Sequence, residues 1–209
     1  MTHPASDRVV GLYQDKAADW ILDRGDRLYG GDEGPDEAVW LGRFLDGLGE
    51  SPSILDVGCG SGWPIGAALL ERGCRVTGLD TSPALIAHAR ETQPRGVWEV
   101  RDMRDRLPEG DFDGVLAWHS LFHLTPAAQG RTLPELARRV APGGRLMFTS
   151  GPAHGETIGQ WRDQPLYHAS LDPEAYHALL RQSGLTLEID GGRKGDGVWL
   201  ARRAFLSAE

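Results

Sequence analysis

The chain has 209 residues, 40% of them hydrophobic and 25% charged, with a formal net charge of −8, which together predict one folded globular domain and disfavour a basic nucleic-acid-binding face. Its two cysteines, Cys59 and Cys74, are too few for a disulfide framework and lack metal-ligand spacing, so both are expected to be small buried thiols. The sequence has no apolar run of membrane length and no apolar signal region, so we expect a cytoplasmic protein. We expect no membrane, nucleic-acid or metal partner, and the sequence leaves the oligomeric state open.

Secondary-structure patterns divide the chain near residue 50. Before it, segments 9–22 and 39–48 predict amphipathic helices that cover an edge or form a lid. After it, strands and helices alternate, which predicts a parallel sheet with helices on both faces. The expected strands are 54–57, 75–79, 97–100, 112–118, 145–149, 185–189 and 198–201, and the expected helices begin near residues 65, 82, 125 and 172.

Three connections carry specific expectations. Residues 142–144 are predicted to form a turn, and the last two strands a hairpin around Gly191 and Gly192. Residues 150–171 show little periodicity and are predicted to form a long loop. A structureless loop of that length in a compact domain is usually functional.

The first strand ends in Asp56 and runs into glycines at 58, 60 and 62, followed by Trp63 and Pro64. Strand, glycine turn and helix start together predict a nucleotide-type site at the carboxyl end of a strand. The spacing does not fit the dinucleotide fingerprint G-x-G-x-x-G, which disfavours a nucleotide-linked reductase. Asp56 would repel a pyrophosphate but attract a cation.

This D-x-G-x-G-x-G run resembles motif I of the class I S-adenosylmethionine-dependent methyltransferases, whose cofactor carries an ammonium and a sulfonium. The resemblance continues at Asp80, at Asp102 with Met103, at Trp118 with His119, and at residues 141–144, so it covers roughly residues 50 to 150. It implies an α/β, Rossmann-like class I methyltransferase fold, with a seven-stranded mixed sheet, an N-terminal helical lid and S-adenosyl-L-methionine as cofactor.

The resemblance also implies which residues hold each part of the cofactor. They are Asp56, Gly58 and Gly60 for the methionyl part, Asp80 with the adjacent Thr81 for the ribose, Asp102 and Met103 for the adenine, and Trp118 at the sulfonium. The segment that contains Tyr13 and Trp20 resembles a helix that closes over the cofactor in small-molecule methyltransferases of this class. The helical spacing of the two aromatic residues also fits core residues.

Histidines are the candidate general bases, because imidazole titrates near neutral pH. His119 and His154 follow strands at the carboxyl edge and are the predicted catalytic residues, whereas His123 lies in an apolar run and fits a hydrogen-bonded packing role. Trp161, Tyr167 and His168 are expected to form an aromatic wall. A metal site at His119 and His123 is disfavoured, because the spacing lacks the Glu of H-E-x-x-H.

These patterns predict one methyltransferase domain over 1–209: a helical cover (1–50), a cofactor-binding core (51–150), and a substrate loop with closing helix and strands (151–209). Segments 150–156 and 166–173 resemble a bacterial subgroup of small methyltransferases. The predicted reaction is in-line methyl transfer to a hydroxyl, amine or carboxylate of a small molecule, with histidine assistance. The alternatives are a non-catalytic cofactor-binding protein and a nucleic-acid or protein methyltransferase, the latter disfavoured because Trp118–Leu121 lacks a Pro-Pro-aromatic motif.

Overall fold

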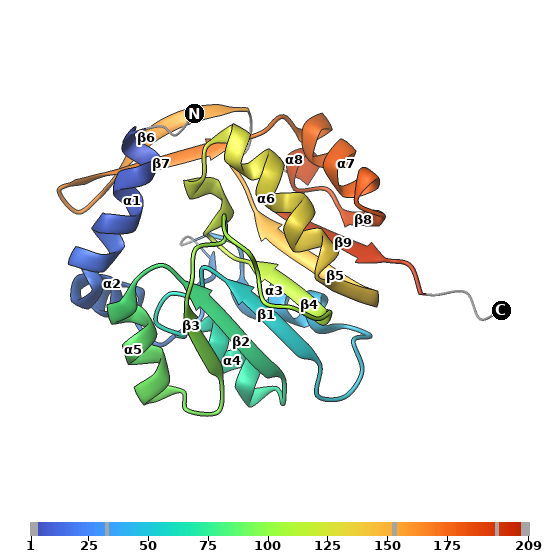
Figure 1. Cartoon of the computed structure of the whole chain (residues 1–209), viewed down its shortest axis with the longest axis horizontal. Coiled ribbons are helices and arrows are strands. Elements are labelled where there is room, and N and C mark those ends of the chain that lie inside the picture. Colours follow the sequence, from blue (N-terminus) through green and yellow to red (C-terminus); the bar gives the residue numbers. More distant parts are fainter. Residues whose placement is uncertain (1–3, 32–33, 152–153, 195–196, 206–209) are drawn as a thin grey trace.

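The computed structural model describes residues 4–31, 34–151, 154–194 and 197–205, and a seven-stranded sheet runs through its centre (Figure 1). The order is β3-β2-β1-β4-β5-β9-β8, with β1 to β5 parallel and β9 antiparallel to both β5 and β8. The strands are β1 (Ser53–Val57), β2 (Arg75–Asp80), β3 (Val97–Val100), β4 (Phe112–Ala117), β5 (Val140–Thr149), β8 (Leu185–Ile189) and β9 (Val198–Arg203). The predicted seven-stranded mixed sheet is thus confirmed.

Helices cover both faces of this sheet. Successive side chains of a strand point to opposite faces, and the strands carry apolar residues on both of them. The helices are α3 (Glu37–Leu45), α4 (Ile65–Glu71), α5 (Pro83–Thr92), α6 (Pro126–Arg138) and α7 (Pro173–Gln182). On β1, Leu55 and Val57 enter a core cluster with α6 and α7, whereas Ile54 enters a second cluster with α3, α4 and α5. The predicted helix start at Ser82 is confirmed, since its hydroxyl accepts a hydrogen bond from the Leu85 amide.

The N-terminal segment differs from the single helix expected over 9–22. It forms two helices, α1 (Pro4–Asp15) and α2 (Ala17–Arg24), because Lys16 leaves helical geometry with ψ of 23°. α3 begins at Glu37, earlier than expected, where the Asp36 side chain accepts from the Val39 amide at 3.0 Å, and it ends at Leu45 rather than 48. α1 lies along the side of the molecule, beside α5 and the second, smaller sheet (Figure 1).

The loop expected over 150–171 is largely a β-hairpin, so that prediction is wrong for most of the segment. Its strands, β6 (Gly155–Trp161) and β7 (Gln164–Ser170), pair antiparallel outside the main sheet. Every described residue of β6 is exposed or half-buried, which removes the apolar alternation that marks a strand. Pro152 and Ala153 of the same segment lie outside the described residues.

Two further connections differ from expectation. The turn predicted at 142–144 lies within β5, which starts at Val140. Phe112 of β4 pairs with Val140, and Gly114 pairs with Arg145, so the residues between Val140 and Arg145 form a bulge in β5. β8 and β9 pair antiparallel as predicted, but Gly191 opens a short helix, α8 (Gly191–Lys194), instead of a tight turn.

Both cysteines are buried and free, as expected. Among the residues that the structure describes, no helix is long and apolar enough to cross a bilayer. The same residues contain no group of three or more metal-ligating side chains.

Candidate functional site

The carboxyl ends of four neighbouring parallel strands meet at one edge of the sheet, and the predicted site residues lie there. Asp56 is in β1, Asp80 ends β2, Asp102 follows β3, and Trp118 follows β4. Ligands of open α/β sheets bind at this edge, where the order of strands reverses. The topology therefore gathers residues that are more than 60 positions apart in the sequence.

The glycine turn after β1 allows this edge to pack closely. Gly58 and Gly60 have φ of 81° and 56°, values that favour glycine. A Cβ at Gly58 would lie 2.3 Å from the Cβ of Ser120, whose hydroxyl donates to the Val57 carbonyl at 2.6 Å. A side chain at Gly58 would therefore push the loop after β4 away from the turn.

Asp80 is fixed by backbone donors on both carboxylate oxygens. The Gly60 amide donates to Oδ2 at 3.0 Å, and the Ser82 amide donates to Oδ1 at 2.9 Å. Burial raises the pKa of Asp80, although these amide hydrogen bonds oppose the rise. Each oxygen keeps further lone pairs, so the carboxylate can still accept hydrogen bonds from a diol.

Asp56 is the least compensated acid of the site. It is 2% exposed, and its Oδ2 has no hydrogen-bond partner among the described residues. Burial first, and the charge of Asp80 second, raise the pKa of Asp56 to about 7. A buried carboxylate oxygen without a partner is costly unless a cation or a donor completes it.

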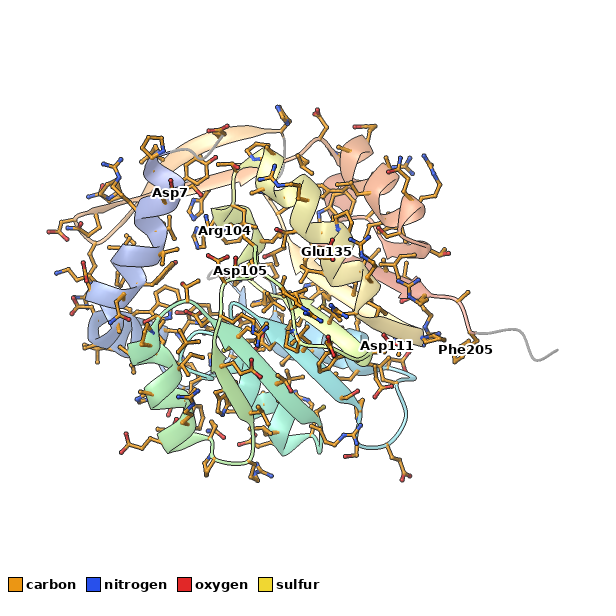
Figure 2. All side chains as sticks on the ribbon, in the orientation of Figure 1. Asp7, Arg104, Asp105, Asp111, Glu135 and Phe205 are labelled. Carbon is orange, nitrogen blue, oxygen red and sulfur yellow. The ribbon has the colours of Figure 1, made fainter. Side chains whose placement is uncertain are left out.

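Asp102 is held in place by Arg104, two residues later in the chain. The Arg104 side chain donates to both oxygens of Asp102, with Nη2 at 2.6 Å from Oδ2, and these hydrogen bonds outweigh burial and lower the pKa of Asp102. Arg104 also lies 3.5 Å from Asp7 of α1, and Figure 2 shows these two side chains next to each other. Arg101, three residues earlier, binds Glu99 instead, at 2.8 Å.

Three adjoining cavities occupy this edge of the sheet. The tip cavity, about 100 Å³, lies between the strand ends and α1 and is lined by Tyr13, Asp80, Asp102 and Met103. The aromatic cavity, about 250 Å³, is lined by Asp56, Trp63, Trp118, Phe122 and His168. The hairpin cavity, about 410 Å³, lies against β6 and β7 and shares only Phe122 and His168 with the aromatic cavity.

The structure brings nearly all the predicted site residues together. The tip cavity receives Tyr13, Trp20, Gly58, Gly60, Asp80, Thr81, Asp102, Met103 and His119. Asp56 and Trp118 line the aromatic cavity, which also shares Tyr13, Trp20, Gly58, Gly60 and His119 with the tip cavity. His154 does not join them: it lies in the hairpin cavity, 54% exposed and 3.8 Å from Asp172.

Tyr13 of α1 and Trp20 of α2 line both the tip cavity and the aromatic cavity, and Trp161 of β6 packs against these two rings. The Tyr13 ring packs edge-on against Trp20, at 5.0 Å between ring centroids, and stacks on Trp161 of β6 at 6.3 Å. The guanidinium of Arg162, which follows Trp161, pairs with Asp19 and Asp23 of α2, at 2.8 Å in each case. The hairpin is thereby fastened to the N-terminal helices.

A buried ion pair behind the aromatic cavity was not predicted from the sequence. Glu37 is fully buried and accepts from Arg24 Nη2 on both oxygens, at 2.7 and 2.8 Å. It also accepts from the Tyr29 amide and, at 2.8 Å, from the indole N–H of Trp118. This network fixes the Trp118 ring and joins the N-terminal helices to the end of β4. No local pattern marks Glu37, which sits in the first turn of an amphipathic helix.

The histidines of the site differ in their hydrogen bonds. His123 has both ring nitrogens engaged: Nδ1 donates to the Tyr167 carbonyl at 2.9 Å, so Nε2 accepts from the Tyr13 hydroxyl at 3.1 Å. This agrees with the hydrogen-bonded packing role expected for His123. The imidazoles of His119 and His168 have no hydrogen-bond partner among the described residues. Burial lowers the pKa of His119 to about 4 and lowers that of half-buried His168 as well.

The chain is similar in sequence to known methyltransferases. A family model described as a methyltransferase domain matches residues 54–144. Magnesium-protoporphyrin O-methyltransferase from Rhodobacter capsulatus is 34% identical, over 76% of this chain and 73% of that protein. Ubiquinone biosynthesis O-methyltransferase from Alkalilimnicola ehrlichii is 30% identical, over 72% of this chain and 65% of that protein.

A solved structure shows the same fold. The crystal structure of magnesium protoporphyrin IX methyltransferase from Synechocystis PCC 6803, with bound SAM, superposes with a TM-score of 0.70 at 16% identity, over 97% of this chain and 98% of the other. At this identity the likeness establishes the Rossmann-like architecture and leaves the acceptor open.

Proposed function

The chain belongs to the S-adenosylmethionine-dependent methyltransferases, and on this premise we propose that it methylates a small organic molecule at a hydroxyl, amine or carboxylate. The relatives named above are named for magnesium-protoporphyrin and for ubiquinone biosynthesis, which supports a small acceptor. The net charge of −8 supports the same choice over a nucleic acid.

The observation that carries the proposal is the buried, unpartnered Oδ2 of Asp56 beside the glycine turn. S-Adenosylmethionine supplies a methyl group on a positively charged sulfur and carries an ammonium group, so it offers the cation that this oxygen lacks. Asp80, held by two backbone amides, is suited to accept from the ribose hydroxyls, with Thr81 beside it. The donor set therefore fits the cofactor.

The remaining cofactor contacts follow from the placement of the cavities. We assign Asp102 and Met103 to the adenine, with Arg104 holding Asp102 in place. Because Tyr13 and His119 line both the tip cavity and the aromatic cavity, the sulfonium is assigned to their junction. Trp118 then borders the methyl group from the aromatic cavity.

Positioning and exclusion of water are the main tasks of this protein, because the methyl group arrives activated. Holding two reactants in line can lower a barrier by roughly 7–11 kcal/mol in the most favourable cases. Tyr13, Trp20 and Trp161 cover the junction and support that role. We further propose that residues 1–50, 51–150 and 151–209 act as cover, cofactor site and substrate side of one domain.

Two measurements test the proposal. Calorimetry should show binding of S-adenosylhomocysteine and none of NAD, and the opposite preference would overturn the cofactor assignment. Incubation with methyl-labelled S-adenosylmethionine and a panel of small hydroxyl, amine and carboxylate compounds should then give labelled product. Tight cofactor binding without label transfer to the panel would favour the non-catalytic alternative.

A further inference from the structure

The three adjoining cavities outline an approach to the transferred methyl group. With the adenosine in the tip cavity and the methionyl group at Asp56, the sulfonium lies where these two cavities share residues. Away from the residues that it shares with the tip cavity, the lining of the aromatic cavity includes Trp118, Phe122, Leu166 and His168. This side continues past Phe122 and His168 into the hairpin cavity, which gives an acceptor a path to the methyl group.

The charges of the aromatic cavity select a neutral acceptor. Among its described lining residues only Arg24 and Asp56 carry a formal charge. Arg24 is bound by both oxygens of Glu37, and Asp56 faces the cofactor ammonium in the proposed complex. A carboxylate acceptor would find no free cation there, and an ammonium acceptor would compete for a single carboxylate. Charged groups without a partner are disfavoured in such a site.

The walls of the aromatic cavity select a flat ring. Trp118 is fixed by its hydrogen bond to Glu37, and Phe122 packs edge-on against both His123 and His168, with centroids 4.8 and 5.0 Å apart. Rigid aromatic faces stack on planar ligands at little cost in conformational entropy. A saturated ligand of the same size gains no such stacking.

His168 is the histidine placed to receive a proton from that ligand. It lines both the aromatic cavity and the hairpin cavity, whose wall carries the exposed residues His154 and Glu156. The His123 ring stacks on His168 at 5.1 Å but has both nitrogens occupied. His119 has a free imidazole but lines the tip cavity and its junction with the aromatic cavity, so in the proposed complex it borders the cofactor, whereas His168 lies on the side of the hairpin cavity.

We propose that the acceptor is a planar aromatic compound with a hydroxyl group, seated against Phe122 and Trp118, and that His168 is the catalytic base that takes the hydroxyl proton. This inference rests on the proposed function. The acceptor oxygen bonds to the methyl carbon as the carbon–sulfur bond breaks, and the electron pair of that bond stays on sulfur. The hydroxyl proton moves to a ring nitrogen of His168 and leaves to water through the hairpin cavity.

The test compares two phenols in the wild-type protein and in His168→Gln. At a pH below both of their pKa values the two phenols enter neutral, but 4-nitrophenol is far more acidic than 4-methylphenol and depends less on a base to remove its proton. Loss of a general base should lower turnover of 4-methylphenol by about 10²–10⁴-fold and lower turnover of 4-nitrophenol much less. His177→Gln serves as the matched control, because His177 binds Asp190 away from the three cavities and should behave as wild type.

Four outcomes would overturn the proposal. Equal losses with both phenols would make His168 a structural residue. Methylation of benzoate or aniline in place of the phenols would refute the acceptor class, as would turnover of cyclohexanol at the rate of 4-methylphenol. If no phenol is methylated while S-adenosylhomocysteine still binds, the acceptor assignment fails and cofactor binding stands. Absence of S-adenosylhomocysteine binding would instead refute the proposed function itself.

Discussion

Replacing Asp56 with asparagine should stabilise the ligand-free protein and weaken its cofactor binding. In the folded chain the carboxyl keeps its proton up to about pH 7, whereas in the unfolded chain it loses that proton near the ordinary value of 3.8. The folded state therefore binds more protons than the unfolded state between these values. Wild-type stability falls as pH rises through this window and stays lower above it.

The size of the effect follows from the width of the window. A shift of about 3 pKa units corresponds to about 4 kcal/mol at alkaline pH, which is the ceiling for the gain from removing the charge. Burial of the asparagine amide reduces the gain in unfolding free energy by an amount that does not depend on pH. The pH dependence of the gain is therefore a better test than its absolute size. The gain should increase by about 2–3 kcal/mol between about pH 5 and about pH 8.

Urea unfolding of both ligand-free proteins at the two pH values measures this change. Calorimetry with S-adenosylhomocysteine should show binding weakened by about 1.5–3 kcal/mol, the range for a hydrogen bond to a charged group. A gain that does not vary with pH would refute the argument from burial. Unchanged affinity would remove Asp56 from the cofactor site.

Three more substitutions test other parts of the site. Asp80→Ala should weaken S-adenosylhomocysteine binding by more than about 1 kcal/mol in calorimetry, because a fixed double acceptor is lost, and unchanged affinity would exclude the ribose assignment. Glu37→Gln should lower the free energy of unfolding by about 3–5 kcal/mol, since Arg24 is left buried without a counter-charge; a loss below about 1 kcal/mol would contradict the buried ion pair. Arg162→Ala should raise the KM for S-adenosylmethionine with kcat nearly unchanged, and added salt should raise the KM of the wild type but not of the variant. Equal salt dependence in both would rule out the hairpin's ion pairs as a fastening for the cover.

The proposed cofactor site was predictable because its signals are local. Asp56, Asp80 and Asp102 each lie at or just after the end of a strand, and parallel strands bring their carboxyl ends to one edge. The glycine spacing and the acid before it separated this turn from a pyrophosphate site. The resemblance to the methyltransferases singled out Asp80 and Asp102, and the order of strands and turns explains why they meet Asp56.

The acceptor side depends on contacts between distant segments, which leave no local pattern. Glu37 binds the Trp118 indole across 81 positions. β6 is too exposed to show a strand period, so the hairpin that places His168 at the cavity boundary was expected as a loop. In the sequence His119 and His154 looked equivalent, because each follows a strand at the carboxyl edge. In the structure they line different cavities: His119 lies at the strand ends, and His154 lies beside the hairpin.

Helix α1 forms one wall of the tip cavity and is fastened at several points, among them Ser6 to the His123 carbonyl at 2.8 Å and Gln14 to the Ser82 hydroxyl at 2.9 Å. With the cofactor in the tip cavity as proposed, exchange of spent for fresh cofactor past α1 requires these hydrogen bonds to break, and each catalytic cycle then includes an opening of this helix. Where such an opening is slower than the chemistry, it sets the rate of the enzyme. A more reactive acceptor would then raise kcat/KM without raising kcat.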